Sequence, residues 1–382
     1  MLSDATRAGA RAGGSLDARW RAQAQAAQSA VLPEGRVVVS CPAPFARGGL
    51  GRHLQEIDTA LARGGREGVC VCEAGGAPGE GTSCREVRVG RLARARLALA
   101  RPWPARRMQA ASVGFDAAAA RQLPRAEHLI AFNGTAVAQF HAAKRSRFES
   151  LSLMAANPHM RRVLAQHELA HRNHPLAPPW TTHLLARNLG EYAAADRVYV
   201  SSHYSWQSFI DEGFSEDALA LFPLTPDARF TAREAPPARD TFEIVYVGAL
   251  TVHKGVPLLV EAVRRLAFAD LRLVLVGGWK TRGMRRFIEA AVAEDERVSV
   301  RPGDPLPRLR DASLYVHAAY EDGFAYAPAE ALACGVPVLV SADTGMKELI
   351  ASERDGLVLP TGALDALTEA IAAAYRREVF GA

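Results

Sequence analysis

Short apolar runs alternate with amphipathic stretches along most of the chain. Residues 36–41 and 69–72 form apolar runs of the kind that become buried parallel strands. Between them, apolar residues recur at three- and four-residue spacing, which predicts a helix over 52–63. A strand, a glycine-rich turn, a helix and a second strand, in this order, predict the start of a doubly wound α/β domain.

The same order of elements begins again in the second half of the chain. The pattern there predicts strands over 242–247, 271–276, 313–317 and 336–340, and helices over 256–266 and 327–333. We therefore expect two doubly wound α/β domains, residues 35–225 and 226–382, with their boundary in a proline-rich stretch. Residues 1–34 are rich in Ala, Arg and Gly, and we expect them to form a flexible extension.

Composition narrows the class of protein. The chain has 382 residues, which is enough for about two domains. Its residues are 49% hydrophobic and 23% charged, and this composition excludes disorder as the main state of the chain. No uncharged apolar run reaches the ~18 residues that a membrane-spanning helix needs. The five cysteines form no CxxC pair, and the histidines have no zinc-site spacing, so we predict a reduced, cytoplasmic protein without a metal site.

Positive charge is concentrated in the first half. Residues 226–382 carry 19 basic and 22 acidic side chains, so the remaining 27 basic and 19 acidic residues give 1–225 a net charge of +8. Residues 85–107 hold eight arginines interleaved with apolar side chains, a pattern that fits either peripheral contact with an anionic membrane or a solvated surface. No nucleic-acid recognition module is visible, so we expect no nucleic-acid partner.

The segment from 320 to 338 carries the most informative chemistry. The strand predicted over 313–317 delivers Asp322, Gly323 and Phe324 to its carboxyl end, where ligands bind in open α/β sheets. Glu330 follows about one turn inside the next helix, so the two acids can converge on one pocket. Carboxylates there can accept hydrogen bonds from a ligand.

This segment resembles the signature of the retaining glycosyltransferases of family 4, which have the GT-B fold. Their signature is an acid, Gly-Phe-Gly, a Glu eight residues after the acid, and Ala-x-Ala-x-Gly-x-Pro-Val. The resemblance implies two Rossmann-like domains facing each other across a cleft, with the donor held by the C-terminal domain and the acceptor by the N-terminal one. It implies that Asp322 contacts the donor sugar and that Glu330 binds the ribose diol. Ala325 departs from the second glycine of the signature.

Two further loops resemble parts of the same family. Gly248 and Lys254 match its Gly-Arg-Leu-…-Lys-Gly loop, which implies that Lys254 contacts the donor diphosphate, although Ala249 stands where many members have Arg. Residues 341–350 match its Gly-Gly-x-x-Glu segment, where backbone amides at a helix N-terminus would meet the diphosphate or sugar. The amides concerned are those of Thr344, Gly345 and Met346.

The first half offers fewer candidates. Gly49 and Gly51 resemble the family's glycine loop after the first strand, where the backbone can approach phosphate and acceptor. His159 lies in a region where members have a cleft histidine, and we take it as the candidate beside the reacting centre. A capping or surface histidine is the other interpretation of this residue.

Together the resemblance implies a retaining glycosyltransferase that moves a sugar from a nucleotide-sugar donor to a hydroxyl of a glycan, lipid-linked or small-molecule acceptor, in bacterial surface polysaccharide or glycoconjugate synthesis. No cofactor and no metal is expected, since cations and helix ends would neutralise the departing phosphate. An epimerase or phosphorylase acting on activated sugars is a rival. So is a catalytically silent GT-B protein that binds a nucleotide sugar or a partner.

Overall fold

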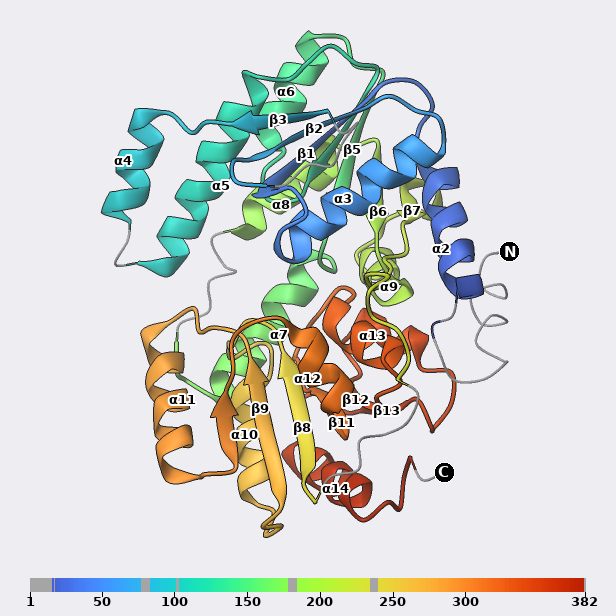
Figure 1. The fold of residues 1–382 in the computed structure, drawn as a ribbon. Coiled ribbons are helices and arrows are strands. Elements are labelled where there is room, and N and C mark those ends of the chain that lie inside the picture. Colours follow the sequence, from blue (N-terminus) through green and yellow to red (C-terminus); the bar gives the residue numbers. More distant parts are fainter. Residues whose placement is uncertain are drawn as a thin grey trace. The chain divides into compact units, whose positions relative to one another are not determined.

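The computed structural model describes residues 16, 18–76, 83–100, 103–177, 184–233 and 240–380. The chain divides into two compact units (Figure 1). We call residues 23–164 and 179–224 the N-terminal unit, and residues 1–22, 165–178 and 225–382 the C-terminal unit. Each unit is built around one parallel sheet.

The N-terminal unit has a seven-stranded parallel sheet in the order β3-β2-β1-β4-β5-β6-β7. Every adjacent pair of strands runs parallel. The strands are β1 (Val37–Pro44), β2 (Gly68–Glu73), β3 (Cys84–Val87), β4 (His128–Phe132), β5 (Ser150–Ala155), β6 (Arg197–Val200) and β7 (Leu219–Leu221). The predicted runs 36–41 and 69–72 are confirmed as β1 and β2.

Helices cover both faces of this sheet. One face packs Val38 and Val71 against Phe115 of α5, and the other carries cysteines whose thiols contact α3. The helices are α2 (Ala18–Val31), α3 (Gly48–Arg63), α4 (Arg91–Leu99), α5 (Pro104–Ala120), α6 (Val137–Arg145), α7 (Met160–Asn173), α8 (Leu185–Ala194) and α9 (His203–Ile210), with the short 3₁₀ helix η3 (Glu216–Ala218). Helices on both faces make the sheet doubly wound.

The start of α3 was predicted four residues too late. The helix begins at Gly48, so the glycine-rich run that we expected to be a loop forms its first turn. At Gly51 a Cβ atom would lie 2.1 Å from the carbonyl oxygen of Pro44, closer than such atoms can approach. This glycine therefore lets α3 pass directly against the end of β1.

The C-terminal unit has a six-stranded parallel sheet in the order β10-β9-β8-β11-β12-β13. Numbered from its own first strand, this is the 3-2-1-4-5-6 order of a Rossmann sheet. The elements are β8 (Phe242–Val247), α10 (Val256–Arg264), β9 (Leu271–Val276), α11 (Arg282–Glu294), β10 (Val298–Val300), α12 (Pro305–Asp311), β11 (Leu314–His317), α13 (Tyr326–Ala333), β12 (Val338–Ser341), η4 (Gly345–Leu349), β13 (Gly356–Leu359) and α14 (Leu364–Tyr375). The predicted strands and helices of this half are all present.

Alternation along β8 explains why both faces of this sheet are covered. Ile244 and Tyr246 enter one core together with residues of α10, α11 and α14. Val245 enters a second core on the other face, with residues of α12 and α13. A strand buried on both faces reads as a continuous apolar run, which is why it could be predicted from sequence.

Two segments depart from the expected organisation. Residues 165–178, which we had placed in the first domain, cluster with the C-terminal unit, where Ala170 of α7 joins the core. Residues 1–15 and 17 of the expected flexible extension lie outside the described residues, while 18–31 of it form helix α2.

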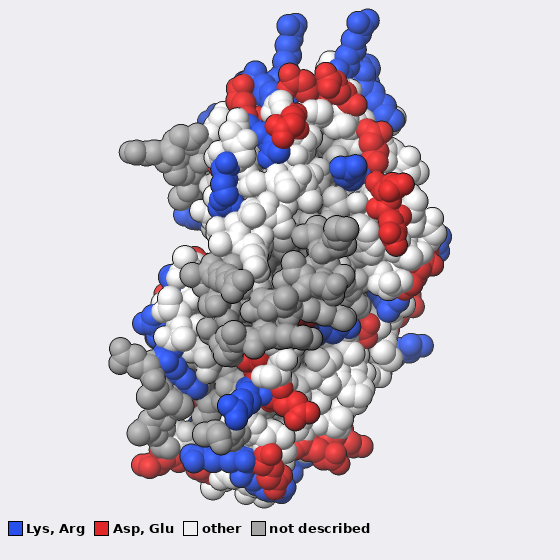
Figure 2. All heavy atoms as spheres, turned by 90° about the vertical axis from the view of Figure 1, so that its right-hand side faces the viewer, with Lys and Arg blue, Asp and Glu red and all other residues white. Residues whose placement is uncertain are grey.

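Neither a one-sign charged patch on the face of Figure 2 nor a membrane-spanning helix is seen among the described residues. On the face seen in Figure 2, the described basic and acidic side chains lie intermixed rather than gathered by sign. Among the described residues, no helix is both long enough and apolar enough to cross a membrane.

Candidate active site

The strongest cluster of polar groups in the C-terminal unit lies where its strand order reverses, between β8 and β11. Both strands point their carboxyl ends to this place, where an open α/β sheet leaves a crevice for ligands. The loop after β8 brings Lys254, and the loop after β11 brings Asp322. Motifs 68 residues apart in the sequence therefore meet at one edge of the sheet.

A glycine allows the loop that carries Lys254 to reach β11. Gly255 has φ +69°, and a Cβ atom there would lie 1.7 Å from the carbonyl oxygen of Ala318. The two loops are further joined by the N–H of Tyr320, which donates to the carbonyl of His253 at 2.8 Å. Only glycine fits both this conformation and this approach, so the Lys-Gly pair is explained by the geometry of the site.

Lys254 and Asp322 form an ion pair. The Lys254 Nζ atom donates to Asp322 Oδ2 at 2.8 Å and to the carbonyl of Glu321 at 3.1 Å. The Nε2 atom of His317, the last residue of β11, lies 3.2 Å from the same Asp322 oxygen and can donate to it. The side chains of Lys254 and Asp322 remain 20% and 19% exposed, so a ligand can reach them.

The electrostatics keep both members of this pair charged. Burial would raise the pKa of Asp322, but the adjacent Lys254 and His317 outweigh it and hold that pKa well below its ordinary value. Burial also opposes the charge on Lys254, yet Asp322 and Glu321 raise its pKa above the ordinary value. A fixed cation beside a fixed anion is therefore present throughout the neutral pH range.

The loop after β12 is tied to the same place. Asp322 and Thr344 form an isolated parallel bridge, in which the Asp322 N–H donates to the carbonyl of Asp343 and the Gly345 N–H donates to the carbonyl of Asp322. The amide of Gly345, which we expected to face a phosphate, is thus occupied within the protein. The segment that follows is the five-residue 3₁₀ helix η4 and not an α-helix.

Two further residues that we expected to contact the donor, Met346 and Phe324, have buried side chains, so they can reach a ligand only through their backbone. The side chain of Met346 is fully buried in the core of the unit, and that of Phe324 is 6% exposed, with its ring 5.6 Å from that of Tyr326. Thr344 is also fully buried, and its hydroxyl oxygen has no hydrogen-bond partner among the described residues. Gly323, next to Phe324 in the loop after β11, is buried as well.

Glu330 lies one turn inside α13, as expected, and only 2% of it is exposed. A carboxylate is seldom buried to this extent without a specific role. The residue before this helix, Ala325, has φ +68°, a conformation that favours glycine. This explains physically why the signature has glycine at this position.

Glycines also bring β8 and β9 together at the same edge. Gly248 has φ +146°, and its carbonyl oxygen would lie 1.8 Å from a Cβ atom on Gly277 at the end of β9. The residue after Gly248 is Ala249, whose carbonyl accepts a hydrogen bond from the buried Tyr246 hydroxyl at 3.0 Å. The backbone around Gly248 is thus fixed from both sides.

The part of the chain that holds this cluster is similar to a known protein family. Residues 228–378 match the family model described as "Glycosyl transferases group 1". They contain every residue of the cluster described above. This part of the chain is a glycosyl transferases group 1 domain.

Curated proteins are similar to this chain over part of its length. The putative colanic acid biosynthesis glycosyltransferase WcaL of Escherichia coli is 28% identical over 42% of this chain and 43% of its own length. The D-inositol 3-phosphate glycosyltransferase of Mycobacteroides abscessus is 29% identical over 46% of this chain and 41% of its own length. The chain thus spans about half the length of the curated relatives it matches, or less.

Structural similarity extends beyond the group 1 domain. The crystal structure of Anabaena HepE in complex with UDP-glucose has a TM-score of 0.64 and 16% identity, covering 90% of this chain and 91% of that one. Two parallel Rossmann-like sheets and this match confirm the GT-B fold.

Sequence reasoning missed a group of buried polar side chains in the C-terminal unit. Glu321 is only 1% exposed, and its carboxylate oxygen Oε2 lies 3.5 Å from Nε2 of His167 on α7. The His167 ring stacks on that of His253, with centroids 4.2 Å apart. Burial and the neighbouring His167 hold the pKa of His253 well below its ordinary value. Nothing in the sequence pairs His167 with a loop more than 80 residues away, although His317 could have been noticed as a polar end to a buried strand.

The candidates of the N-terminal unit do not form one cluster. Gly49 is exposed in the first turn of α3, whereas Gly51 is explained by its packing against Pro44. His159 is 2% exposed, and its ring lies 4.8 Å from that of Tyr192 and 5.2 Å from that of Phe209.

His159 has a structural role at the start of α7. Its Nδ1 atom accepts from the N–H of Arg161 at 3.4 Å, which is the capping role that we had weighed as the alternative. Burial and the nearby Arg161 lower its pKa to about 4, so it is neutral at pH 7. We therefore leave His159 out of the proposed site.

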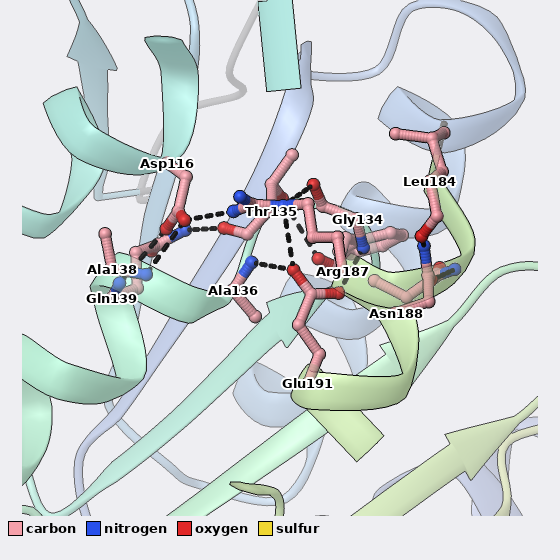
Figure 3. A network of polar contacts seen from close by, with 12 residues as sticks. Asp116, Gly134, Thr135, Ala136, Ala138, Gln139, Leu184, Arg187, Asn188 and Glu191 are labelled. Atoms are coloured by element: carbon pink, nitrogen blue, oxygen red, sulfur yellow. Dashed lines mark hydrogen bonds and ion pairs between the residues drawn. The ribbon is translucent and has the colours of Figure 1, made fainter. Parts of the chain in front are cut away.

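A buried polar network occupies the N-terminal unit at the start of α6 (Figure 3). Figure 3 shows the carboxylates of Asp116 and Glu191 pointing at the backbone, with Arg187 between them. Glu191 accepts from the N–H groups of Gly134 and Ala136. Asp116 accepts from those of Ala138 and Gln139. Arg187 donates to Asp116 and to the carbonyl of Gly134. The chain's own carboxylates thus fill this helix N-terminus.

Among the residues that the structure describes, no group of three or more His, Cys, Asp or Glu side chains is arranged to hold a metal ion.

Proposed function

We propose that this protein is a retaining glycosyltransferase that transfers a sugar from a nucleotide-sugar donor to a hydroxyl group. The observation that carries the proposal is the Lys254–Asp322 pair at the strand-order reversal of the group 1 domain. A cation and an anion held 2.8 Å apart and partly exposed suit a ligand that joins a phosphate to a polyol.

Each residue has a distinct part in this proposal. Lys254 stabilises the negative charge that develops on the departing diphosphate. Asp322, kept ionised by its neighbours, accepts hydrogen bonds from hydroxyls of the donor sugar, and Glu330 accepts from the ribose. The acceptor hydroxyl attacks from the face that the diphosphate leaves, and the departing phosphate takes its proton.

The class of donor is supported by similarity. The HepE structure, which shares this fold, is a complex with UDP-glucose, and the curated relatives are named as glycosyltransferases of colanic acid biosynthesis and of D-inositol 3-phosphate. We infer that the donor is a nucleoside diphosphate sugar and that the acceptor is a glycan, a lipid-linked sugar or a small polyol.

We further propose that the arginine-rich segment 85–107 contacts an anionic membrane. Helix α4 within it has no buried residue, and Leu92, Leu99 and Trp103 are 83%, 75% and 55% exposed. Exposed apolar side chains beside arginines suit the boundary of a lipid surface. Co-sedimentation with vesicles containing anionic lipid should fall markedly for Leu92→Ser/Leu99→Ser and stay unchanged for the exposed control Val292→Ser. Equal sedimentation of both variants would reject this contact.

The decisive experiment measures nucleotide release from a panel of UDP-, GDP-, ADP- and dTDP-sugars. Slow release from one donor is expected, and Lys254→Ala should reduce it at least 100-fold, because one fixed charge on a departing phosphate contributes on the order of 3 kcal/mol. Lys280→Ala, an exposed lysine of the same unit, is the matched control and should release nucleotide at the wild-type rate.

Donor affinity tests the part of Glu330. Glu330→Ala should weaken donor binding at least tenfold, since a buried carboxylate that accepts from a diol is removed. Unchanged affinity would remove Glu330 from the site. Binding of a donor without release, even with glycan or lipid acceptors supplied, would favour the silent-binder alternative.

A further inference from the structure

Four of the five cysteines lie on one face of the N-terminal sheet. The strand register places Cys41 of β1 opposite Cys72 of β2, and Cys70 of β2 opposite Cys84 of β3. Directly opposite residues of a parallel pair point to the same face, and so do residues two apart on one strand. These four thiols therefore share the face that α3 covers.

Within this group Cys72 and Cys84 are distinguished by their separation. Their sulfur atoms lie 2.8 Å apart, so a disulfide with its S–S distance of about 2.05 Å needs a movement of only ~0.8 Å. The other two thiols have partners elsewhere. Cys70 donates to Asp58 Oδ1 at 3.5 Å, and Cys41 donates to the carbonyl of Leu50 at 3.6 Å.

The environment of the pair favours reaction at one sulfur and resolution by the other. Cys84 is partly exposed on the edge strand β3, whereas Cys72 is 1% exposed. The hydrogen bond from Cys84 lowers the pKa of Cys72 below that of an ordinary thiol, although burial opposes this. The same hydrogen bond raises the pKa of Cys84. One hydrogen bond thus joins an accessible sulfur to a buried one.

We propose that Cys72 and Cys84 form a reversible thiol–disulfide site that reacts with small-molecule disulfides. Cys84 loses its proton and attacks one sulfur of the reagent RSSR, and the departing RS⁻ takes up a proton as RSH. Cys72 then loses its proton and attacks the Cys84 sulfur of the mixed disulfide. This breaks the Cys84–SR bond, and the second RS⁻ also takes up a proton as RSH. The two cysteines lose two electrons, and RSSR gains them.

The site lies beside the start of α3. The backbone N–H of Phe45 lies close enough to the Cys72 sulfur to lower the pKa of that thiol, and Phe45 precedes the glycine-rich first turn of α3 by three residues. Gly76, which follows β2, packs so closely on Phe45 that a Cβ atom would lie 2.5 Å from its nitrogen. Disulfide formation changes the sulfur beside the Phe45 backbone, so it should change the local stability of residues 45–51.

Intact mass and peptide mapping test the proposal on the folded full-length chain with glutathione disulfide as the reagent. Wild type should lose two hydrogen atoms in mass and yield a Cys72–Cys84 cross-linked peptide, and dithiothreitol should reverse both. Cys72→Ser should stop at a glutathione adduct on Cys84, because the resolving sulfur is gone. Cys334→Ser, which removes the cysteine of the other unit, should behave like wild type.

Two results would overturn the proposal. One is a stable glutathione adduct on Cys84 of the wild type with no cross-link. The other is a mixture of cross-links that includes Cys41 or Cys70 as often as Cys72, in folded protein as in urea. Hydrogen exchange of residues 45–51 should differ between the reduced and oxidised chains at least severalfold, and identical exchange would refute the coupling to α3.

Discussion

The two units share the strand order 3-2-1-4-5-6 over their first six strands but use its reversal point differently. In the C-terminal unit, the loops after β8 and β11 bring together a lysine and an aspartate that remain 20% and 19% exposed. In the N-terminal unit, the equivalent strands are β1 and β4, and the helix after β4 receives Asp116 and Glu191, which are 2% and 0% exposed. A ligand can reach the reversal point of the C-terminal unit. In the N-terminal unit, the helix N-terminus after β4 is occupied by the carboxylates of the chain itself.

The difference lies in what satisfies the helix N-terminus. Free N–H groups at such a place attract an anion because their partial positive charges add up. At α6 four of these amides already donate to two carboxylates, and Arg187 forms an ion pair with each carboxylate. In the N-terminal unit the helix N-terminus after β4 is therefore occupied by the chain's own side chains.

This comparison shows that a shared topology fixes where a site can form but does not decide whether one does. A carboxylate at the end of a strand or helix can bind a ligand or can replace one. Burial and backbone partners distinguish the two cases. Replacing a carboxylate by its amide in each unit therefore tests the distinction directly.

The largest effect is expected from Glu191→Gln in the N-terminal unit. Glu191 accepts from two backbone N–H groups and forms an ion pair with Arg187. In the glutamine variant, the side-chain NH₂ group would face one of these N–H donors, and the buried ion pair would be lost. The free energy of unfolding should fall by roughly 3–5 kcal/mol. Urea unfolding followed by circular dichroism measures this, with the exposed Glu168→Gln as control. A change below 1 kcal/mol would mean that the network does not hold α6.

Asp322→Asn should have the opposite profile in the C-terminal unit. The Lys254–Asp322 pair is mostly buried and holds the pKa of Asp322 well below its ordinary value, so losing the charge should cost roughly 1–3 kcal/mol of stability, less than Glu191→Gln. If the proposed function holds, nucleotide release should fall ~100-fold, since a charged hydrogen-bond acceptor for the donor sugar is gone. Release rates and urea unfolding on the same preparation separate the two effects. Large destabilisation with unaltered release would make Asp322 structural, like Glu191.

Most of the fold could be predicted from sequence because parallel strands buried on both faces are continuous apolar runs. The runs at β1, β2, β8, β9, β11 and β12 stand out for this reason. The start of α3 could not be predicted, because glycines weaken the helical pattern while the need for Gly51 arises only from contact with Pro44. Such an approach between segments leaves no trace in local periodicity.

The site divides in the same way. Lys254, Asp322 and Glu330 could be singled out because their spacing matches the motifs of a known family, in the loops after β8 and β11 and in α13. The stacking of His167 on His253 and the contact between His167 and Glu321 could not be predicted, because they depend on where residues 165–178 pack. The role of His159 could not be decided from sequence, because a lone histidine before a helix looks the same whether it caps the helix or faces a ligand.

His159 also allows the structural character of the N-terminal unit to be tested by pH. Its pKa is lowered to about 4, so the unfolded chain binds a proton that the folded chain does not between pH 6.5 and 4. This contribution to stability is complete above pH 6.5 and is lost as the pH falls. Between pH 7 and 5, wild type should lose roughly 2 kcal/mol more than His159→Phe, measured by urea unfolding. The exposed His141→Gln is the control, and parallel losses in all three proteins would refute the assignment.

The smallest effect concerns the one residue of the signature loop that departs from glycine. Ala325 holds φ +68°, which strains an alanine by about 1–3 kcal/mol, while glycine adds about 1 kcal/mol of unfolded-state entropy. Ala325→Gly should therefore raise the free energy of unfolding by ~1 kcal/mol and the melting temperature by a few degrees. Ala327→Gly, within α13, should instead lower both. If Ala325→Gly destabilises the protein as much as Ala327→Gly does, then Ala325 does not hold a positive φ in the loop between Asp322 and Glu330.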